Sequence, residues 1–143
     1  VLETQPENGD ALIGMARVAM GMGDSGAMSG WLDQIPIESP AHAKGVRLRG
    51  LLAFNEDAGD ASTLEAMVAK DAENADAWYR LGATYAVASR FELSFGAFLK
   101  VVALDRELRE DGARKALLSL FELVGAEDEL VIKARRRLAS LLF

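Results

Sequence analysis

One short stretch of this chain restricts its fold more than any other feature. Four residues follow the pattern W-x2-L-G-x2-Y, and they are Trp78, Leu81, Gly82 and Tyr85. In a helix of 3.6 residues per turn these positions share one face. We expect the three bulky side chains to fill a groove and the glycine to let a partner helix come close.

A second helix follows this motif at once. Residues 89 and 90, Ser-Arg, suit the turn, and four apolar residues then recur at helical spacing: Phe91, Phe95, Phe98 and Val102. A helix pair of this size cannot bury its own faces, so we expect neighbouring pairs to stack on it.

The motif resembles the opening of the tetratricopeptide repeat (TPR), a helix-turn-helix unit. The rest of the chain suits this class, because half of its 143 residues are apolar and only three are proline. We predict an all-α, TPR-like right-handed α-solenoid of about four helix pairs in a single domain, residues 1–143. The expected repeats are roughly 9–40, 41–72, 75–106 and 111–143. Trp78 is the expected anchor, and Trp78→Ala should cost roughly 3–5 kcal/mol.

Composition excludes several functional classes. The chain carries 22 acidic and 16 basic residues, a net charge of −6, which argues against general nucleic-acid binding. No apolar run approaches the ~20 residues that span a bilayer, so we expect no membrane segment. The absence of cysteine excludes disulfides and thiolate metal sites. A reducing, cytoplasmic location fits this composition.

Two features imitate chemical sites. Residues 21–26 read G-x-G-x-x-G, but a dinucleotide loop follows a strand, whereas a helical pattern precedes this one. We interpret it as a turn between helices. His42 is the only histidine and has no clustered partners, so we predict no catalytic, cofactor-binding or metal-binding residue and no enzymatic activity.

Methionines are concentrated in the first repeat. They are Met15, Met20, Met22 and Met28. Three interpretations stay open: filling of gaps in a glycine-rich core, an adaptable binding surface, and packing against whatever precedes Val1.

The similarity to TPRs implies a concave groove that is lined by the first helix of each pair and binds extended peptides. At the matching positions stand Arg17, Arg47, Tyr79 and Lys115. Tyr79 is the best candidate for an aromatic contact. A clamp for a C-terminal carboxylate is not expected, because Tyr79 and Ala83 stand where such TPRs place Lys and Asn.

The last helix combines a basic face with an apolar end. No acidic residue follows Glu129, four cations lie at Lys133, Arg135, Arg136 and Arg137, and residues 138–143 are almost entirely apolar. A partner-docking helix and a purely structural cap both explain this pattern, since cations in the C-terminal half also suit the helix dipole. A helix on a membrane surface is the weakest of the three, because the apolar stripe is needed for packing.

The tail carries a more specific likeness. Residues 113–125, ARKALLSLFELVG, and residues 134–143, ARRRLASLLF, resemble the C-terminal end of the bacterial thioredoxin-like YbbN/CnoX chaperedoxins. Residues 6–36 are similar to the first repeat of that family. The resemblance implies a co-chaperone and holdase that delivers unfolded client proteins to the GroEL chaperonin. It places the docking residues at Arg135, Arg136, Arg137, Leu138, Leu141, Leu142 and Phe143.

In that family a thioredoxin-like domain precedes the TPR-like domain. The present chain starts at Val1 without methionine, so we expect it to be a fragment whose upstream thioredoxin-like domain is missing. The alternative is a generic TPR adaptor that binds a peptide of another protein in its concave groove.

Overall fold

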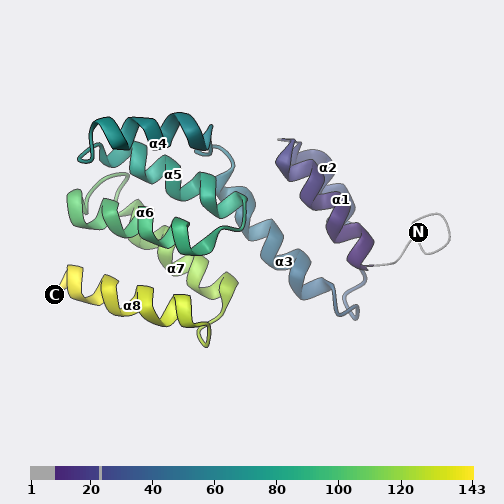
Figure 1. Ribbon diagram of the computed structural model, residues 1–143. Coiled ribbons are helices and arrows are strands. Elements are labelled where there is room, and N and C mark those ends of the chain that lie inside the picture. The colour runs from purple at the N-terminus through teal and green to yellow at the C-terminus, as the bar shows by residue number, and fades with distance from the viewer. Residues whose placement is uncertain (1–8, 23) are drawn as a thin grey trace. The chain divides into compact units, whose positions relative to one another are not determined.

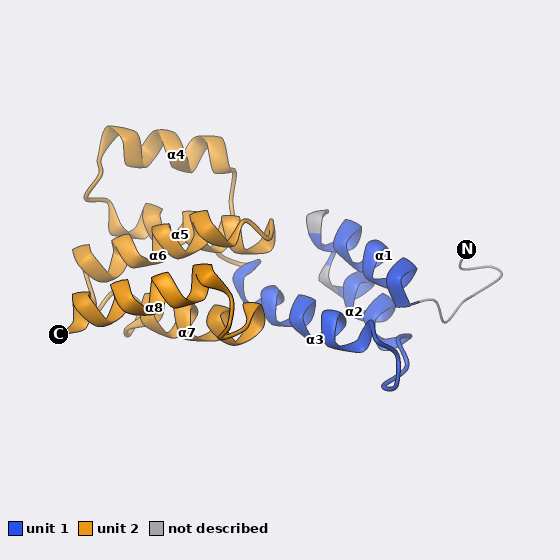
Figure 2. Ribbon diagram, turned by 60° about the horizontal axis from the view of Figure 1, so that its bottom comes forward, with its two compact units in different colours: residues 1–55 blue, residues 56–143 orange. Residues whose placement is uncertain are grey.

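The computed structural model describes residues 9–22 and 24–143, and all regular secondary structure in this part of the chain is helical. It contains eight α-helices and one short 3-10 helix, without a strand, which confirms the predicted all-α class. The chain forms two compact units, residues 1–55 and residues 56–143, shown in blue and orange in Figure 2. No helix in the described ranges is long and apolar enough to cross a membrane.

Unit 1 consists of two paired helices and a third that packs on both of them. Its elements are α1 (Gly9–Gly21), α2 (Ser25–Asp33), α3 (His42–Leu51) and the 3-10 helix η1 (Leu52–Phe54). Leu12 of α1 and Met28 of α2 are fully buried between the helices. Asp24 caps α2, because its carboxylate accepts a hydrogen bond of 2.9 Å from the backbone N–H of Ala27.

The G-x-G-x-x-G stretch covers the end of α1 and the start of α2, at a junction between helices as the sequence indicates. Helix α1 ends at Gly21 and α2 begins at Ser25, while Gly23 lies outside the described residues. Two of the methionines, Met20 and Met28, are buried, whereas Met22 is largely exposed. Gap filling therefore accounts for part of the methionine cluster.

Unit 2 contains five helices that follow one another through short connections (Figure 1). They are α4 (Ala61–Lys70), α5 (Ala75–Val87), α6 (Phe91–Leu104), α7 (Gly112–Val124) and α8 (Glu129–Leu142). Helix α5 packs on α4 and α6, and α6 also contacts α7 and α8. Side-chain oxygens of Asp60, Asn74 and Asp128 cap α4, α5 and α8.

The α5–α6 hairpin is built as the motif predicts. A Cβ added to Gly82 would lie 2.7 Å from the ring of Phe98, so only glycine allows this approach. The buried hydroxyl of Ser94 donates a hydrogen bond of 2.8 Å to the carbonyl of Gly82 and fixes the same crossing point. Ser89 makes the turn with a positive φ of 59°.

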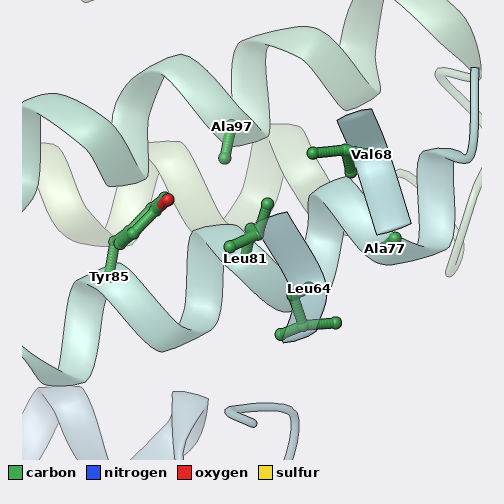
Figure 3. Close-up of a cluster of buried hydrophobic side chains, with 6 residues drawn as sticks. All are labelled: Leu64, Val68, Ala77, Leu81, Tyr85 and Ala97. Atoms are coloured by element: carbon green, nitrogen blue, oxygen red, sulfur yellow. The ribbon is translucent and has the colours of Figure 1, made fainter. Parts of the chain in front are cut away.

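The motif tryptophan is less buried than expected. Trp78 is half-buried at the edge of a core cluster, and its indole N–H donates a hydrogen bond of 2.8 Å to the carbonyl of Ala72. The cluster, drawn in Figure 3, comprises Leu64, Val68, Ala77, Leu81, Tyr85 and Ala97. Phe98 of α6 is fully buried, so the role of buried anchor that the sequence suggests for Trp78 is better filled by Phe98.

Tyr85 ties α5 to α4 through its hydroxyl. This hydroxyl donates a hydrogen bond to the carboxylate of Glu65, and the ring is buried. Burial, together with the hydrogen bond and the negative charge of Glu65, raises the pKa of Tyr85 to about 12.

The boundary between the units falls inside the second predicted repeat. Helix α3 belongs to unit 1 and α4 to unit 2, and the loop at residues 55–60 joins them. That residues 1–143 form a single domain of four repeats stays a prediction.

Candidate functional site

Tyr79 is the aromatic residue that sequence analysis assigns to the concave groove. It lies on α5, and the edge of its ring meets the buried ring of Phe98 at a centroid distance of 5.2 Å. The guanidinium carbon of Arg109 lies 4.5 Å from the centroid of the Tyr79 ring. Burial and the nearby carboxylate of Asp57 raise the pKa of Tyr79, although the charge of Arg109 opposes them. Much of the Tyr79 side chain therefore packs against other residues of unit 2.

Arg109 reaches Tyr79 from the connection between α6 and α7. Its two terminal nitrogens contact Asp57 at 2.6 Å and Asp76 at 3.1 Å. Burial lowers the pKa of Arg109, but hydrogen bonds and charges from the two aspartates outweigh this effect and raise it. We call this arrangement the Arg109 bridge, consisting of Arg109, Asp57, Asp76 and Tyr79.

The Arg109 bridge holds an unusual backbone. Arg109, Glu110 and Asp111 have φ angles of 55°, 57° and 66°, so three consecutive residues without glycine are left-handed. Each such residue costs on the order of 1–2 kcal/mol. The ion pairs and the stacking on Tyr79 offset part of this cost and hold the loop that leads into α7.

The other three predicted groove residues are exposed cations. Arg17 lies on α1 and Arg47 on α3, both in unit 1, whereas Lys115 lies on α7 in unit 2. Tyr79 and Lys115 thus share a unit with each other but not with the two arginines. The common groove formed by all four stays a prediction.

Helix α8 has one buried stripe and one basic face. Val131, Ala134 and Leu138 are buried against the rest of unit 2. The cations at positions 133, 135, 136 and 137 are exposed. Among them, the guanidinium of Arg135 covers the ring of Phe121 on α7 at 5.2 Å. The helix is therefore packed in place, with its charges directed outward.

The predicted docking residues of this helix differ in accessibility. Leu138 is only 5% exposed, so it serves the packing of unit 2. Leu141 and Leu142 are half-buried, and Phe143 is fully exposed. Leu142 and Phe143 line an open cavity of about 590 Å³ together with residues of the loop before α7.

A second surface at α8 was not anticipated from the sequence. A groove of about 250 Å³ runs between α6 and α8, and we call it the α6–α8 groove. Its lining comprises Glu92, Phe95, Gly96, Leu99, Leu130, Lys133, Ala134 and Arg137. The one signal for it in the sequence is Gly96, which stands between larger apolar residues of α6. The residues of α8 across the groove follow more than thirty residues later, so spacing along the chain does not reveal them.

The described residues contain no group of three or more acidic, histidine or cysteine side chains that could hold a metal ion. His42 is half-buried at the start of α3 and lines a small cavity of about 180 Å³ with Asp33 and Arg49 nearby. Asp33 and Arg49 form an ion pair with each other.

The model of the tetratricopeptide repeat family matches residues 54–143. The chain belongs to this family. The match covers well over half of the chain and begins two residues before unit 2, so the TPR part and the larger compact unit nearly coincide. No curated protein and no solved structure gives a significant match to this chain.

Membership of the TPR family indicates the general role of the helices in unit 2. TPR domains are generally non-catalytic modules that bind other proteins, and their stacked helix pairs present extended surfaces for this purpose. The side chains on these surfaces determine which one binds a partner and what chemistry that partner has.

Proposed function

We propose that this TPR protein is the docking module of a cytoplasmic, thioredoxin-like co-chaperone that delivers unfolded clients to the GroEL chaperonin. Helix α8 is the docking element in this proposal. One observation carries it: α8 completes its packing with Val131, Ala134 and Leu138 and still presents four cations to solvent. The likeness of the tail to the chaperedoxins supplies the identity of the partner.

An exposed basic helix face suits a docking role for a physical reason. Charges at the rim of an interface accelerate encounter with a partner of opposite sign and fix its orientation. The remainder of the chain is strongly acidic, because the net charge is −6 in spite of these cations. The basic face is thus a local feature of α8, and an acidic partner surface is directed to it.

The generic adaptor with a concave groove is equally compatible with the TPR family. Its expected aromatic contact, Tyr79, is however covered by Arg109 and packed on Phe98. A groove ligand would have to compete with Arg109, which Asp57 and Asp76 hold in place, for the face of the ring that Arg109 covers. This arrangement favours α8 over the groove as the first docking surface.

Capture of GroEL by the immobilised protein tests the proposal. Deleting residues 138–143 is a poor test because it removes the buried Leu138, so charge reversal is preferable. Arg136→Glu with Arg137→Glu should reduce capture roughly tenfold, since each exposed pair is worth up to about 1 kcal/mol. Lys115→Glu, an exposed cation of α7 in the expected groove, is the matched control and should leave capture unchanged.

The opposite pattern would support the groove adaptor. Loss of capture with Lys115→Glu but not with the α8 variant would move the docking surface to the groove. If the unmodified protein captured no GroEL, the chaperonin would be excluded as the partner.

A further inference from the structure

The α6–α8 groove has an apolar floor made by two helices. Phe95 and Leu99 contribute from α6, and Leu130 and Ala134 contribute from α8. The two helices lie side by side in unit 2 (Figures 1 and 2). Since Phe95 also packs edge-on against Phe121 of α7 at 5.2 Å, the floor is held by the core beneath it.

Gly96 keeps this groove open. A Cβ built on Gly96 meets no atom within 4 Å, so no described neighbour requires a glycine here. Glycine inside a helix lowers its stability relative to alanine. Gly82, by contrast, is required by the ring of Phe98. Gly14 and Gly30 are equally free of neighbours, so what distinguishes Gly96 is its place in the lining of a groove, where the missing side chain leaves room for one from a partner.

The rim of the groove is positively charged on one side. Lys133 and Arg137 stand one helical turn apart on α8, and both line the groove. Neither has an ion-pair partner among the described residues. Glu92 of α6 is the acidic residue of the lining.

We propose that the α6–α8 groove binds an acidic amphipathic helix of a partner protein. Two parallel walls formed by helices provide the seat into which a third helix packs by its apolar side chains. Apolar residues at i, i+3 and i+4 of that helix pack on the apolar floor of the groove, in the space beside Gly96. Asp or Glu residues one turn apart pair with Lys133 and Arg137. The inference rests on the proposed role of α8 in docking and specifies where on α8 the partner lies.

A designed peptide is the probe for this groove. It is fluorescently labelled, carries leucines at i, i+3, i+4 and i+7, and has glutamates one turn apart along the edge of that face. A second peptide replaces each glutamate with glutamine. By fluorescence anisotropy we expect the glutamate peptide to bind and the glutamine peptide to bind about three- to tenfold more weakly.

Charge variants of the protein locate the binding. Lys133→Glu with Arg137→Glu should weaken the glutamate peptide about tenfold, whereas Arg136→Glu, an exposed cation of the same helix outside the groove, should change binding less than about twofold. Equal weakening by both variants would show a general attraction to the basic helix and overturn the proposal.

Gly96→Met fills the groove without touching the core, because the space around Gly96 is empty. It should weaken the glutamate peptide at least about tenfold. Gly30→Met on α2, where a Cβ also meets no atom within 4 Å, is the matched control and should bind as the unmodified protein does. Undiminished binding by Gly96→Met, or no binding of the peptide at all, would overturn the proposal.

Two further measurements separate this inference from the proposed function. If Gly96→Met captures GroEL as well as the unmodified protein does, the chaperonin docks outside the groove. The inference that the partner lies in the groove then fails, while the proposed function stands. Peptide binding that depends on Gly96, without capture of GroEL, supports the groove and overturns the chaperonin as partner. Dimerisation in sedimentation velocity that Gly96→Met abolishes would assign the groove to a second copy and overturn the acidic partner.

Discussion

The two sides of α6 are built in opposite ways. Toward α5 the interface is closed, because the ring of Phe98 lies against Gly82 and the hydroxyl of Ser94 is bonded to the carbonyl of Gly82. Toward α8 the interface leaves the α6–α8 groove, with Gly96 in its lining and empty space above it. One helix thus contributes both to the core of unit 2 and to an open groove between two helices.

The difference shows that a glycine in a helix can have two unrelated purposes. Gly82 is a requirement of close packing, and a larger residue must collide with an aromatic ring there. Gly96 is not required by packing, and a larger residue there projects into open space. Stability and accessibility are therefore separable by substitution on the two sides of α6.

The largest effect is expected from truncating the closed side. Phe98→Ala should lower the free energy of unfolding by about 3–5 kcal/mol, because the ring is fully buried and leaves a cavity. Urea denaturation followed by circular dichroism measures this change. Trp78→Ala should cost less, since Trp78 is only half-buried. An equal or larger loss with Trp78→Ala would restore the tryptophan as the anchor.

Overfilling the same interface should cost less than emptying it. Gly82→Ala places a methyl group 2.7 Å from the Phe98 ring and should destabilise unit 2 by about 1–3 kcal/mol, in spite of the better helix propensity of alanine. A double-mutant cycle with Phe98→Leu should show positive coupling, because the smaller side chain makes room. Strict additivity of the two changes would show that the ring and the glycine do not constrain each other.

The closed side should also respond to alkaline pH through Tyr85. Its pKa is raised to about 12 in the folded protein, against about 10 in an unfolded chain. The folded state keeps its proton while the unfolded chain loses it, so this stabilisation is complete below about pH 10 and falls as pH rises toward 12. We expect a loss of about 1–2 kcal/mol by about pH 11.

Urea denaturation at several pH values measures that loss, and Tyr85→Phe should remove it, since phenylalanine has no proton to lose. Gly96→Ala lies outside the cluster around Tyr85 and should keep the full pH dependence. An identical pH dependence for Tyr85→Phe and the unmodified protein would exclude Tyr85 as its source.

The smallest effect, and one of opposite sign, is expected on the open side. Gly96→Ala should stabilise unit 2 by up to about 1 kcal/mol, because alanine favours the helix and meets no neighbour. Thermal unfolding should show a higher midpoint than for the unmodified protein. A lower midpoint would mean that a close contact exists at Gly96, and the contrast between the two sides of α6 would disappear.

The α5–α6 interface was predictable from the sequence because the residues that form it lie close together in the chain. The spacing of Leu81, Gly82 and Tyr85 and the position of Phe98 follow from helix periodicity and one short turn. The turn itself was predicted correctly at residues 89 and 90, although Ser89 needs a positive φ without glycine. Spacing did not reveal how deeply Trp78 is buried, because burial depends on what covers a residue from elsewhere.

The features that sequence analysis missed all depend on distant partners. Arg109 meets Asp57 and Asp76, which lie 52 and 33 residues earlier, and nothing in the local sequence marks them as partners. Residues 109–111 lack the glycine or asparagine that usually signals left-handed backbone. The α6–α8 groove likewise arises only when residues 92–99 and residues 130–137, on two different helices, are brought together. The docking and groove assignments stay predictions.

The Arg109 bridge has a consequence for how unit 2 unfolds. In a repeat array each unit normally interacts with its immediate neighbours, so stability propagates step by step along the chain. Arg109, before α7, is joined to Asp57, before α4, and this ion pair spans the whole α5–α6 hairpin. Hydrogen exchange should therefore show the amides of α4 and α7 opening together in the unmodified protein and separately in Arg109→Ala. We expect such coupling beyond nearest neighbours to make α4 and α7 unfold as one unit, as the parts of a globular domain do.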